Sequence, residues 1–235
     1  MMKERLDKFL SSQTALSRKE AQKAIKEKRV LLNGTVIRAA DTKVDTESDT
    51  VSLDGQPLTY QQYVYYMMDK PAGVVSATKD REERTVLDLL PPELYRDGLF
   101  PAGRLDKDTT GLLLITDDGD YAHRMLSPKK HVQKRYIATL DREPDDSIAS
   151  AFEAGIVLGD GTVCKSGQAV PLGGCRVTVE ISEGKYHQVK RMFAALGYHV
   201  EALRRVRIGG LALDEGLHPG EVRALTAEEA QKVFD

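Results

Sequence analysis

Apolar residues near the start of the chain recur at helical spacing. Leucine or phenylalanine occupies positions 6, 9 and 10, an i, i+3, i+4 pattern that predicts a short amphipathic helix. Ser17-Arg-Lys-Glu20 is a capping box, so a second helix is predicted to begin at about Arg18. Ala21, Ala24 and Ile25 form its apolar face, and Lys19, Lys23 and Lys26 form the opposite, basic face.

A hairpin pattern follows these two helices. In the segment Val30–Ile37, Asn33-Gly34 stands between two apolar pairs, which is a strong signal for a two-residue β-turn. The segment Gly55–Pro57 supplies the next break. The pattern therefore predicts a small module of two helices and a hairpin-based sheet, which we assign to residues 1–58.

From residue 59 onward, β-like apolar runs alternate with helical stretches. Segment 63–75 is β-rich and is broken by Lys70-Pro71, and 85–90 reads as a short helix that ends at a proline pair. We expect a helix over 186–196, with Gly197 as its stop, and a last helix from Thr226. Three apolar strands are also predicted, at 112–116, 136–140 and 177–181. This order predicts an α+β fold class, with a mixed, largely antiparallel sheet and flanking helices over residues 59–235.

Composition narrows the class of protein. The chain has 235 residues with 41% hydrophobic residues, which is enough for a true core. Its two cysteines, Cys164 and Cys175, form no C-x-x-C pair, and the histidines show no metal-ligand spacing. The first residues are charged, and no apolar run approaches the roughly 20 residues that a membrane helix needs. We therefore expect a cytoplasmic protein with no metal and no membrane contact.

The charge distribution is more informative than the net charge. The 34 basic and 36 acidic residues give −2, but residues 1–40 hold ten basic and four acidic residues, a local charge of +6. Segment 129–135 adds four basic residues and no acid, and Arg204, Arg205 and Arg207 form another basic group. Local positive stripes on a nearly neutral chain indicate a polyanionic partner.

The run Phe100–Ile115 places Asp106 in a turn beside Arg104, directly before an apolar strand. An ionised carboxylate at the end of a strand can act as a nucleophile. Asp106-Lys-Asp108-Thr-Thr-Gly111 also partly matches a calcium loop, but such loops are flanked by helices and usually end in Glu. A phosphatase that forms an aspartyl-phosphate would place its apolar strand before the aspartate. A structural turn remains the simplest reading of Asp108.

The first module resembles the S4 RNA-binding domain of a ribosomal small-subunit protein. The matching residues are Arg5–Leu10, Ser17-Arg18, Ala24-Ile25 and Val30–Gly34. The resemblance implies that the second helix and the Asn-Gly turn face RNA. The implied RNA contacts of this module are Arg5, Arg18, Lys19, Lys23, Lys26 and Asn33.

Nearly the whole chain resembles the RsuA-type pseudouridine synthases, which modify bacterial ribosomal RNA. The matching motifs, in chain order, are Lys70-Pro71, Gly103–Asp106, Asp108–Gly111, Lys134-Arg-Tyr136, Glu183–Met192 and Arg207–Gly210. Asp69 is a departure, because members often carry Asn before Lys-Pro; it lies outside the catalytic run.

The resemblance implies a role for each motif residue. Asp106 corresponds to the essential aspartate, Tyr136 to the tyrosine that stacks on the base, and Lys190 to the basic residue that pairs with the aspartate. A core position for Tyr136 and a solvated helix position for Lys190 are the alternatives. The remaining RNA contacts that we expect in this region are Arg104, Lys134, His187 and Arg191.

The predicted function is isomerisation of one uridine to pseudouridine in ribosomal RNA, with the target base flipped into the pocket. His187–Lys190 resembles the small-subunit type more closely, and a large-subunit enzyme is the alternative within the family. A non-catalytic RNA-binding assembly factor and a metal-dependent phosphate enzyme are the competing classes. The reaction moves no electrons, so we expect no cofactor. We expect the partner to be ribosomal RNA or a pre-ribosomal particle, and the protein to be a monomer.

Overall fold

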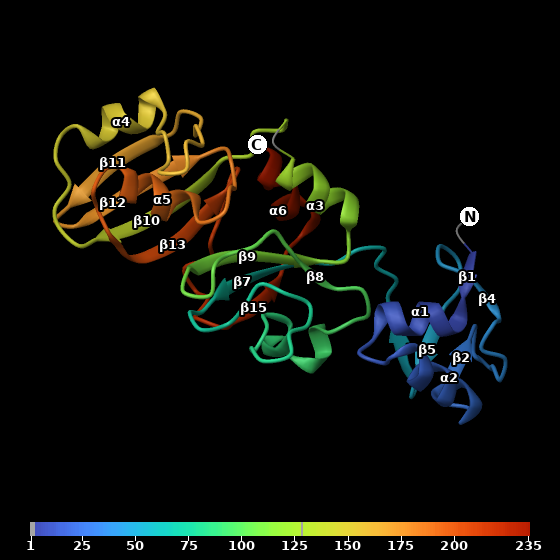
Figure 1. The fold of residues 1–235 in the computed structure, drawn as a ribbon. Helices are drawn as coiled ribbons and strands as arrows, with labels where there is room; N and C mark the ends of the chain where they lie inside the picture. Colours follow the sequence, from blue (N-terminus) through green and yellow to red (C-terminus); the bar gives the residue numbers. More distant parts are fainter. Residues whose placement is uncertain (1–2, 128) are drawn as a thin grey trace. The chain divides into compact units, whose positions relative to one another are not determined.

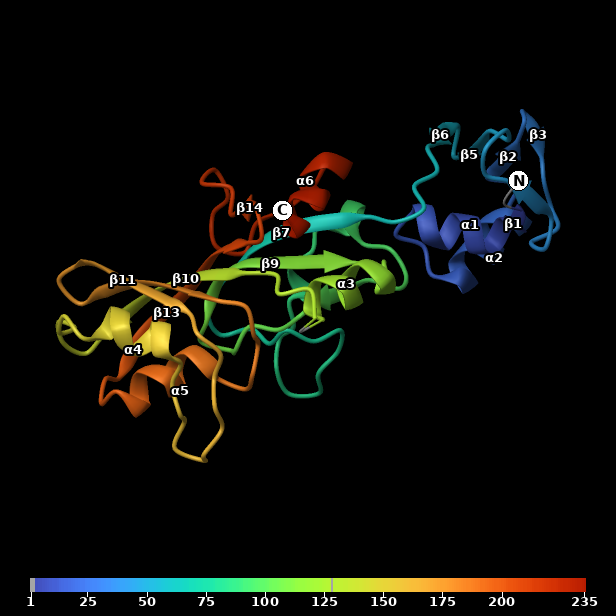
Figure 2. The same ribbon diagram turned by 90° about the horizontal axis from the view of Figure 1, so that it is seen from above.

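The computed structural model describes residues 3–127 and 129–235. The chain forms two compact units, which Figures 1 and 2 show in two orientations. The first contains the chain up to Val64 together with Leu90–Leu99. The second contains Tyr65–Leu89 and Phe100–Asp235. In the described part of the chain, no helix is long and apolar enough to cross a membrane.

The first unit contains the two predicted helices, α1 (Leu6–Gln13) and α2 (Arg18–Lys26). The capping box is formed in both directions: the Ser17 side chain accepts from the Glu20 amide, and the Glu20 side chain accepts from the Ser17 amide. Both sides of the box satisfy amides that the first helical turn leaves without partners. The apolar faces of both helices lie in one core cluster with members of the strands: Leu6, Phe9, Leu10, Ala21, Ala24, Ile25, Val30, Val44 and Val51.

Short strands complete the first unit. The predicted hairpin is present, with φ of 50° at Asn33 and 77° at Gly34, as a turn with two left-handed residues requires. Its strands belong to a four-stranded sheet in the order β3 (Thr35–Val36), β2 (Val30–Leu32), β5 (Val51–Leu53), β6 (Gln56–Leu58). A second, two-stranded sheet that the sequence did not suggest pairs β1 (Lys3–Arg5) with β4 (Lys43–Asp45). One 3₁₀ turn, η2 (Pro92–Leu94), lies in the later segment of this unit.

A nine-stranded sheet forms the centre of the second unit. Its order is β11 (Gln168–Gly173), β12 (Arg176–Ile181), β10 (Lys134–Leu140), β13 (Val200–Ile208), β9 (Thr110–Thr116), β7 (Tyr65–Lys70), β15 (Val222–Ala224). Two short strands lie off this path: β14 (Leu211–Ala212) pairs with β13, and β8 (Phe100–Ala102) pairs with β9. All pairs are antiparallel except β13 with β9. The predicted mixed, largely antiparallel sheet is confirmed.

Helices pack at both ends of this sheet. Helices α3 (Gly119–Leu126) and α6 (Ala227–Gln231), with the turn η3 (Lys232–Phe234), share a core cluster with β7, β9 and β13. Helices α4 (Ile148–Ala154) and α5 (Gln188–Ala195) lie at the end of the sheet that contains β10 to β13 (Figure 1). They meet through Phe152 and Phe193, whose ring centroids are 5.2 Å apart.

Two predicted helices are shorter than expected. The segment 85–90 contains only a 3₁₀ turn, η1 (Leu87–Leu89), in which the Asp88 side chain accepts hydrogen bonds from Thr85. The helix expected from Tyr186 begins at Gln188, because His187 adopts a left-handed conformation with φ of 46°. Gly197, with φ of 82°, ends this helix as predicted.

Gly111 explains how the parallel pair forms. Strands β9 and β13 touch where Arg204 pairs with Thr110 and Arg205 pairs with Gly111. Gly111 has φ of 99°, and a Cβ placed there would lie only 2.2 Å from the carbonyl oxygen of Arg205. Only glycine permits this approach without moving one of the strands.

Candidate active site

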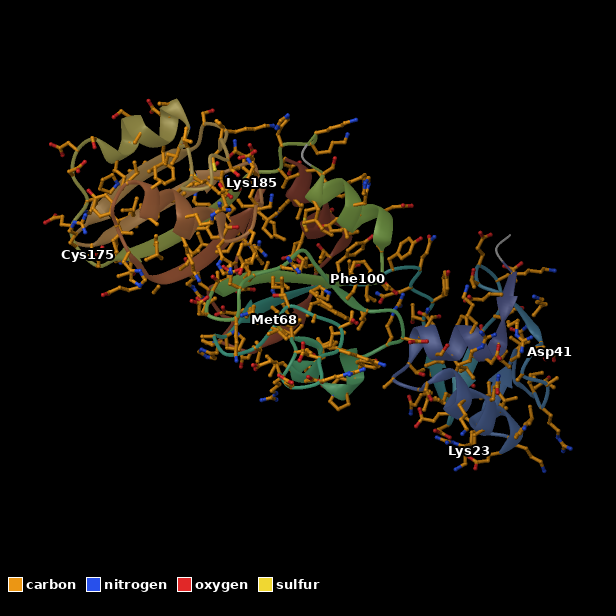
Figure 3. All side chains as sticks on the ribbon, in the orientation of Figure 1. Lys23, Asp41, Met68, Phe100, Cys175 and Lys185 are labelled. Atoms are coloured by element: carbon orange, nitrogen blue, oxygen red, sulfur yellow. The ribbon has the colours of Figure 1, made fainter. Side chains whose placement is uncertain are left out.

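Asp106 lies in the loop between β8 and β9, at a pocket of about 750 Å³ in the second unit. The loop is therefore flanked by strands, as expected for the catalytic interpretation and not for a helix-flanked calcium loop. The pocket wall includes residues from the loop, from strands β10, β12 and β13, and from the start of α5. Figure 3 shows the side chains of this region as sticks.

Two side chains from the segment at the start of α5 approach the Asp106 carboxylate. Lys190 Nζ lies 3.6 Å from Asp106 Oδ2, and His187 Nε2 lies 3.4 Å from Asp106 Oδ1. Lys190 also forms a closer ion pair with Asp108, at 2.6 Å, and this contact lowers the pKa of the Asp108 carboxyl. The Lys190 ammonium is thus shared between the two aspartates of the loop. The family resemblance had implied a pair with Asp106 alone.

The left-handed conformation of His187 aims its imidazole at Asp106. A positive φ is uncommon for residues other than glycine, and such conformations cluster at functional sites. The His187 ring stacks on Tyr186, with 3.8 Å between the ring centroids. The imidazole lies within ion-pair distance of the Asp106 carboxylate, and the expected contact of His187 with RNA stays a prediction.

Lys70 fixes the backbone of the Asp106 loop through hydrogen bonds from its buried ammonium. Its side chain is completely buried, and its ammonium donates to the carbonyl oxygens of Pro71 (3.0 Å), Asp106 (3.1 Å), Lys107 (3.3 Å) and Thr109 (2.9 Å). Burial lowers the pKa of Lys70 to about 8. The sequence analysis used Lys70 only as a motif residue. The sequence signal for this role is a lysine that closes an apolar strand directly before a proline, a position at which its side chain can continue the buried face.

Tyr136 and Lys134 lie on the pocket wall, both on β10. Tyr136 is 8% exposed, so it is a nearly buried strand residue that also lines the pocket, and its stacking on a base stays a prediction. Lys134 is 7% exposed and donates to the Val132 carbonyl, and burial lowers its pKa to about 8. We expected Lys134 to contact RNA as part of an exposed basic run. It faces the pocket because the side chains of a strand alternate between faces.

The other arginines expected near the site have different environments. Arg104 is exposed and lines the pocket. Arg191 points away from Asp106 and forms an ion pair with Asp160, whose pKa falls to about 2 through backbone and side-chain contacts with Thr162 and the contact with Arg191. The structure thus brings Asp106, His187, Tyr136 and Lys134 to the lining of one pocket. Lys190 lies outside this lining and reaches the Asp106 carboxylate, whereas Arg191 lies outside it and pairs with Asp160.

The basic group at 204–207 does not form an exposed stripe. Arg204 makes two hydrogen bonds to Asp69, which is completely buried. Arg207 contacts Glu180, and Arg205 is buried at 3% exposure. These residues belong to strand β13, where Arg204 and Arg207 pair with carboxylates inside the second unit and Arg205 donates to the Leu112 carbonyl. Asp69, the departure from the family pattern, is therefore a structural partner of Arg204.

In the first unit, the expected RNA contacts divide into two groups. Arg5 and Arg18 both bind Asp7, whose pKa is lowered mainly by Arg5, and Asn33 binds Asp49 and the Thr50 amide. Three lysines on one face of α2 are exposed instead, as Figure 3 illustrates for Lys23: Lys19, Lys23 and Lys26.

Two family models match the chain. The one described as RNA pseudouridylate synthase matches residues 64–195, and the one described as S4 domain matches residues 4–51. The chain is 46% identical to the ribosomal small subunit pseudouridine synthase A of Yersinia pestis, over 97% of each chain. It is 44% identical to an uncharacterised RNA pseudouridine synthase, YtzG, of Bacillus subtilis (strain 168), over 96% of each.

A solved structure has the same fold. A crystal structure of a pseudouridylate synthase superposes with a TM-score of 0.69 at 40% identity, covering 97% of this chain and 99% of that one. At this coverage the match extends through both compact units.

Proposed function

We propose that small-subunit ribosomal RNA is the substrate of this chain, which belongs to the RsuA-type family of RNA pseudouridine synthases. The curated relative from Yersinia pestis carries the small subunit in its name and matches nearly the full length of both chains. The proposal assigns the isomerisation of one uridine to the pocket at Asp106. The observation that supports it best is the Asp106 carboxylate held at the pocket between Lys190 and His187.

The reaction requires one well-placed carboxylate. The bond between ribose C1′ and uracil N1 breaks, the base turns, and C1′ joins C5, which loses its proton. An aspartate is ionised at neutral pH, and it can attack C1′, add to the uracil ring or remove a ribose proton. We assign this role to Asp106. The Lys70 ammonium fixes the carbonyls of the loop, and Lys190 and His187 orient the carboxylate, so the catalytic group is positioned before the base enters.

Tyr136 is the assigned partner of the flipped base. Its ring lines the pocket on β10, and an aromatic face in a pocket stacks on a base without regard to the surrounding sequence. Flipping a base costs a few kcal/mol of unstacking, less in loops than in helices. Phosphate contacts made by exposed basic residues can offset this cost. We assign such contacts to Arg104 near the pocket and to the lysines of α2.

The first unit supplies affinity in this proposal. The S4 match and the exposed lysine face of α2 support an RNA contact there. Arg5, Arg18 and Asn33 hold the module together through Asp7 and Asp49, and they reach RNA only by sharing those contacts. We further propose a monomer that acts on ribosomal RNA or a pre-ribosomal particle in the bacterial cytoplasm.

Mapping pseudouridines in ribosomal RNA from cells with and without this protein tests the substrate. We expect one small-subunit uridine to lose its modification when the protein is absent and to regain it on complementation. A lost site in the large subunit would instead assign the chain to the other branch of the family. Unchanged modification, together with no release of tritium from C5-labelled uridine in either purified RNA, would favour the assembly factor.

A further inference from the structure

Two buried polar atoms without partners lie at the same pocket. Among the residues that the structure describes, three buried side-chain nitrogen or oxygen atoms lack a hydrogen-bond partner. Two of them, Arg205 Nη2 and Thr109 Oγ1, belong to residues that line the pocket at Asp106. Because leaving a buried polar group unpaired costs about 1–3 kcal/mol, and more for a charged group, this concentration suggests a ligand that completes the bonding.

The Arg205 guanidinium donates one hydrogen bond, from Nε, and its Nη2 has no partner among the described residues. Arg205 is 3% exposed, and its Nε donates to the Leu112 carbonyl at 2.8 Å. Its other neighbours on β13, Arg204 and Arg207, both contact carboxylates. The strand register places Arg205 directly opposite Tyr136, so the two side chains share one face of the sheet.

Lys134 is the second buried cation of this face. It precedes Tyr136 by two residues on β10 and therefore points to the same side. Its ammonium donates to a single backbone carbonyl, that of Val132 at 3.1 Å. Burial lowers its pKa, and the positive charge of Arg205 lowers it further.

The carboxylates of the pocket have other partners. Asp106 is engaged by Lys190 and His187, and Glu183 accepts from Lys185, Gln188 and the Lys165 amide. In the described residues, no ion pair joins Lys134 or Arg205 to a carboxylate. Two desolvated cations on one wall cost free energy unless a negative or strongly accepting group joins them.

The position of the two cations indicates which group they receive. Phosphates of an RNA strand are met by exposed side chains, and here both cations are more than nine-tenths buried beside Tyr136. The part of the substrate that penetrates to Tyr136 is the flipped base, which carries the acceptors O2 and O4. An RNA phosphate is therefore the less suitable occupant.

We infer that Arg205 and Lys134 bind the oxygens of the flipped uracil and stabilise the negative charge that the base carries while it is detached from ribose. The inference rests on the proposed reaction and adds residues that carry the leaving base. The inference takes the two routes in which Asp106 attacks C1′ or removes a ribose proton: the C1′–N1 bond then breaks, and its electron pair stays on the base as uracilate. When C5 joins C1′, its proton leaves and N1 gains one, so the charge of the base returns to zero.

A pair of cations also suits the turning of the base. Rotation by half a turn about the axis through N3 and C6 exchanges N1 with C5 and O2 with O4. Two neighbouring donors, Arg205 and Lys134, can bind O2 or O4 both before and after this rotation. A single donor with a fixed direction would bind the base in only one of the two orientations. The charge of the wall holds the base in the pocket during the exchange.

Single-turnover kinetics of Arg205→Ala and Lys134→Met test this inference. We expect each variant to lose roughly 100-fold in the rate constant, the size of effect seen when one donor to a developing anion is removed. RNA affinity should change by less than about threefold, because the many phosphate contacts remain. Arg207→Ala is the matched control: it lies on the same strand, contacts Glu180, and should stay within about threefold of wild type.

Chemical rescue and atom substitution separate a charge-bearing role from a structural one. Methylguanidinium should restore activity to Arg205→Ala at least tenfold. RNA with 2-thiouridine or 4-thiouridine at the target should slow the wild type, because sulfur is a weaker acceptor, and should slow Arg205→Ala by a smaller factor. Equal slowing of wild type and variant, or no slowing of the wild type by either thio substitution, would overturn the inference.

Different measurements test the proposed substrate and the proposed role of Arg205 and Lys134. Wild-type turnover of small-subunit or large-subunit RNA decides the substrate, and the ratio of variant to wild type on whichever RNA reacts decides the inference. Circular dichroism and melting temperature show whether a variant is folded. If Arg205→Ala does not fold, Arg205→Lys and the thio substitutions with wild-type protein still decide, because they leave the packing of the wall in place.

Discussion

Basic side chains lie on the surface of α2 in the first unit. In the second unit, by contrast, most basic side chains close to Asp106 are buried or bound to internal acceptors, with Arg104 as an exposed exception. Lys19, Lys23 and Lys26 are exposed to solvent. Lys70 and Lys134 are buried, and Lys190 is shared between two aspartates. Under the proposed function, lysine therefore serves RNA affinity in the first unit and the positioning of the reacting groups in the second. A chain with a net charge of −2 can still present a local concentration of exposed cations to a polyanion, here on α2.

The largest difference between the two units is expected at Asp106, where a substitution should affect the rate constant and leave RNA affinity almost unchanged. We expect Asp106→Asn to reduce the rate constant by roughly 10,000-fold or more, because the carboxylate is the reacting group and the amide is of similar size. RNA affinity should stay within about threefold, since the first unit is untouched. Release of tritium from C5-labelled RNA measures the rate, with protein from a cell that lacks the wild-type enzyme as the contamination control. Turnover above that control would remove Asp106 from the catalytic role.

The next largest effect is expected at Lys190. Lys190→Met keeps the aliphatic part and removes the charge, and the rate should fall roughly 100-fold because the Asp106 carboxylate loses one of its two positioning contacts. Lys190→Arg should retain part of the activity, since its charge remains but its geometry differs. Asp108→Asn is the control: Asp108 is 73% exposed, so losing its ion pair should change the rate by less than about threefold. A larger effect at Asp108 than at Lys190 would mean that the ammonium serves Asp108.

Lys70 should affect stability more than RNA binding. Lys70→Met leaves four carbonyls without their donor, and we expect a loss of about 2–4 kcal/mol in the free energy of unfolding. Lys107→Met, which breaks a surface ion pair with Glu83, should cost less than about 1 kcal/mol. Urea unfolding measures both.

The difference between wild type and Lys70→Met should also depend on pH. The folded pKa of Lys70 is about 8, below the ordinary value of 10.5, so the unfolded chain holds more protons between these two values. Wild type should therefore gain stability relative to the variant as the pH rises from about 8 to about 10.5. Lys134 has a similar folded pKa in both proteins, so its contribution cancels in the difference. A constant difference across this range would contradict the lowered folded pKa of Lys70.

The smallest expected effect concerns the first unit. Replacing Lys19, Lys23 and Lys26 with Ala should weaken RNA binding roughly tenfold and lower the salt slope by roughly 0.7–0.9 for each lost phosphate contact. The rate constant for bound RNA should not change. Arg29→Ala, which removes a cation held by Asp54, should leave the slope nearly unchanged. A salt slope equal to wild type in the triple variant would show that α2 does not face the RNA.

The sequence predicted those elements whose signals are local. The capping boxes at Ser17 and Thr226 and the turn at Asn33-Gly34 depend on residues a few positions apart, and all three are present. The helix from Tyr186 was predicted two residues too early, because its apolar spacing does not reveal the left-handed conformation of His187. Strand β13 was missed since its arginines resemble a surface stripe, and only the sheet shows where their partners lie.

The site was predictable in its motif residues and not in its contacts. The run around Asp106 and the helix bearing Lys190 could be recognised as segments, but the sharing of Lys190 with Asp108 depends on how two distant segments meet. The burial of Lys70 and Lys134 follows from their places on strands β7 and β10, at positions where a lysine is unusual. Arg205 became a candidate only when its unpaired nitrogen was seen beside the pocket.

Gly111 limits how this site can change by substitution. It follows the Asp106 loop on one strand, and its missing side chain leaves the space taken by the Arg205 backbone on the other. A side chain at position 111 would push both strands apart, so the aspartate and the arginine would move together. A substitution at position 111 would therefore disturb both strands that carry pocket residues, whereas Arg104 and Tyr186 are exposed and can be replaced without moving either strand.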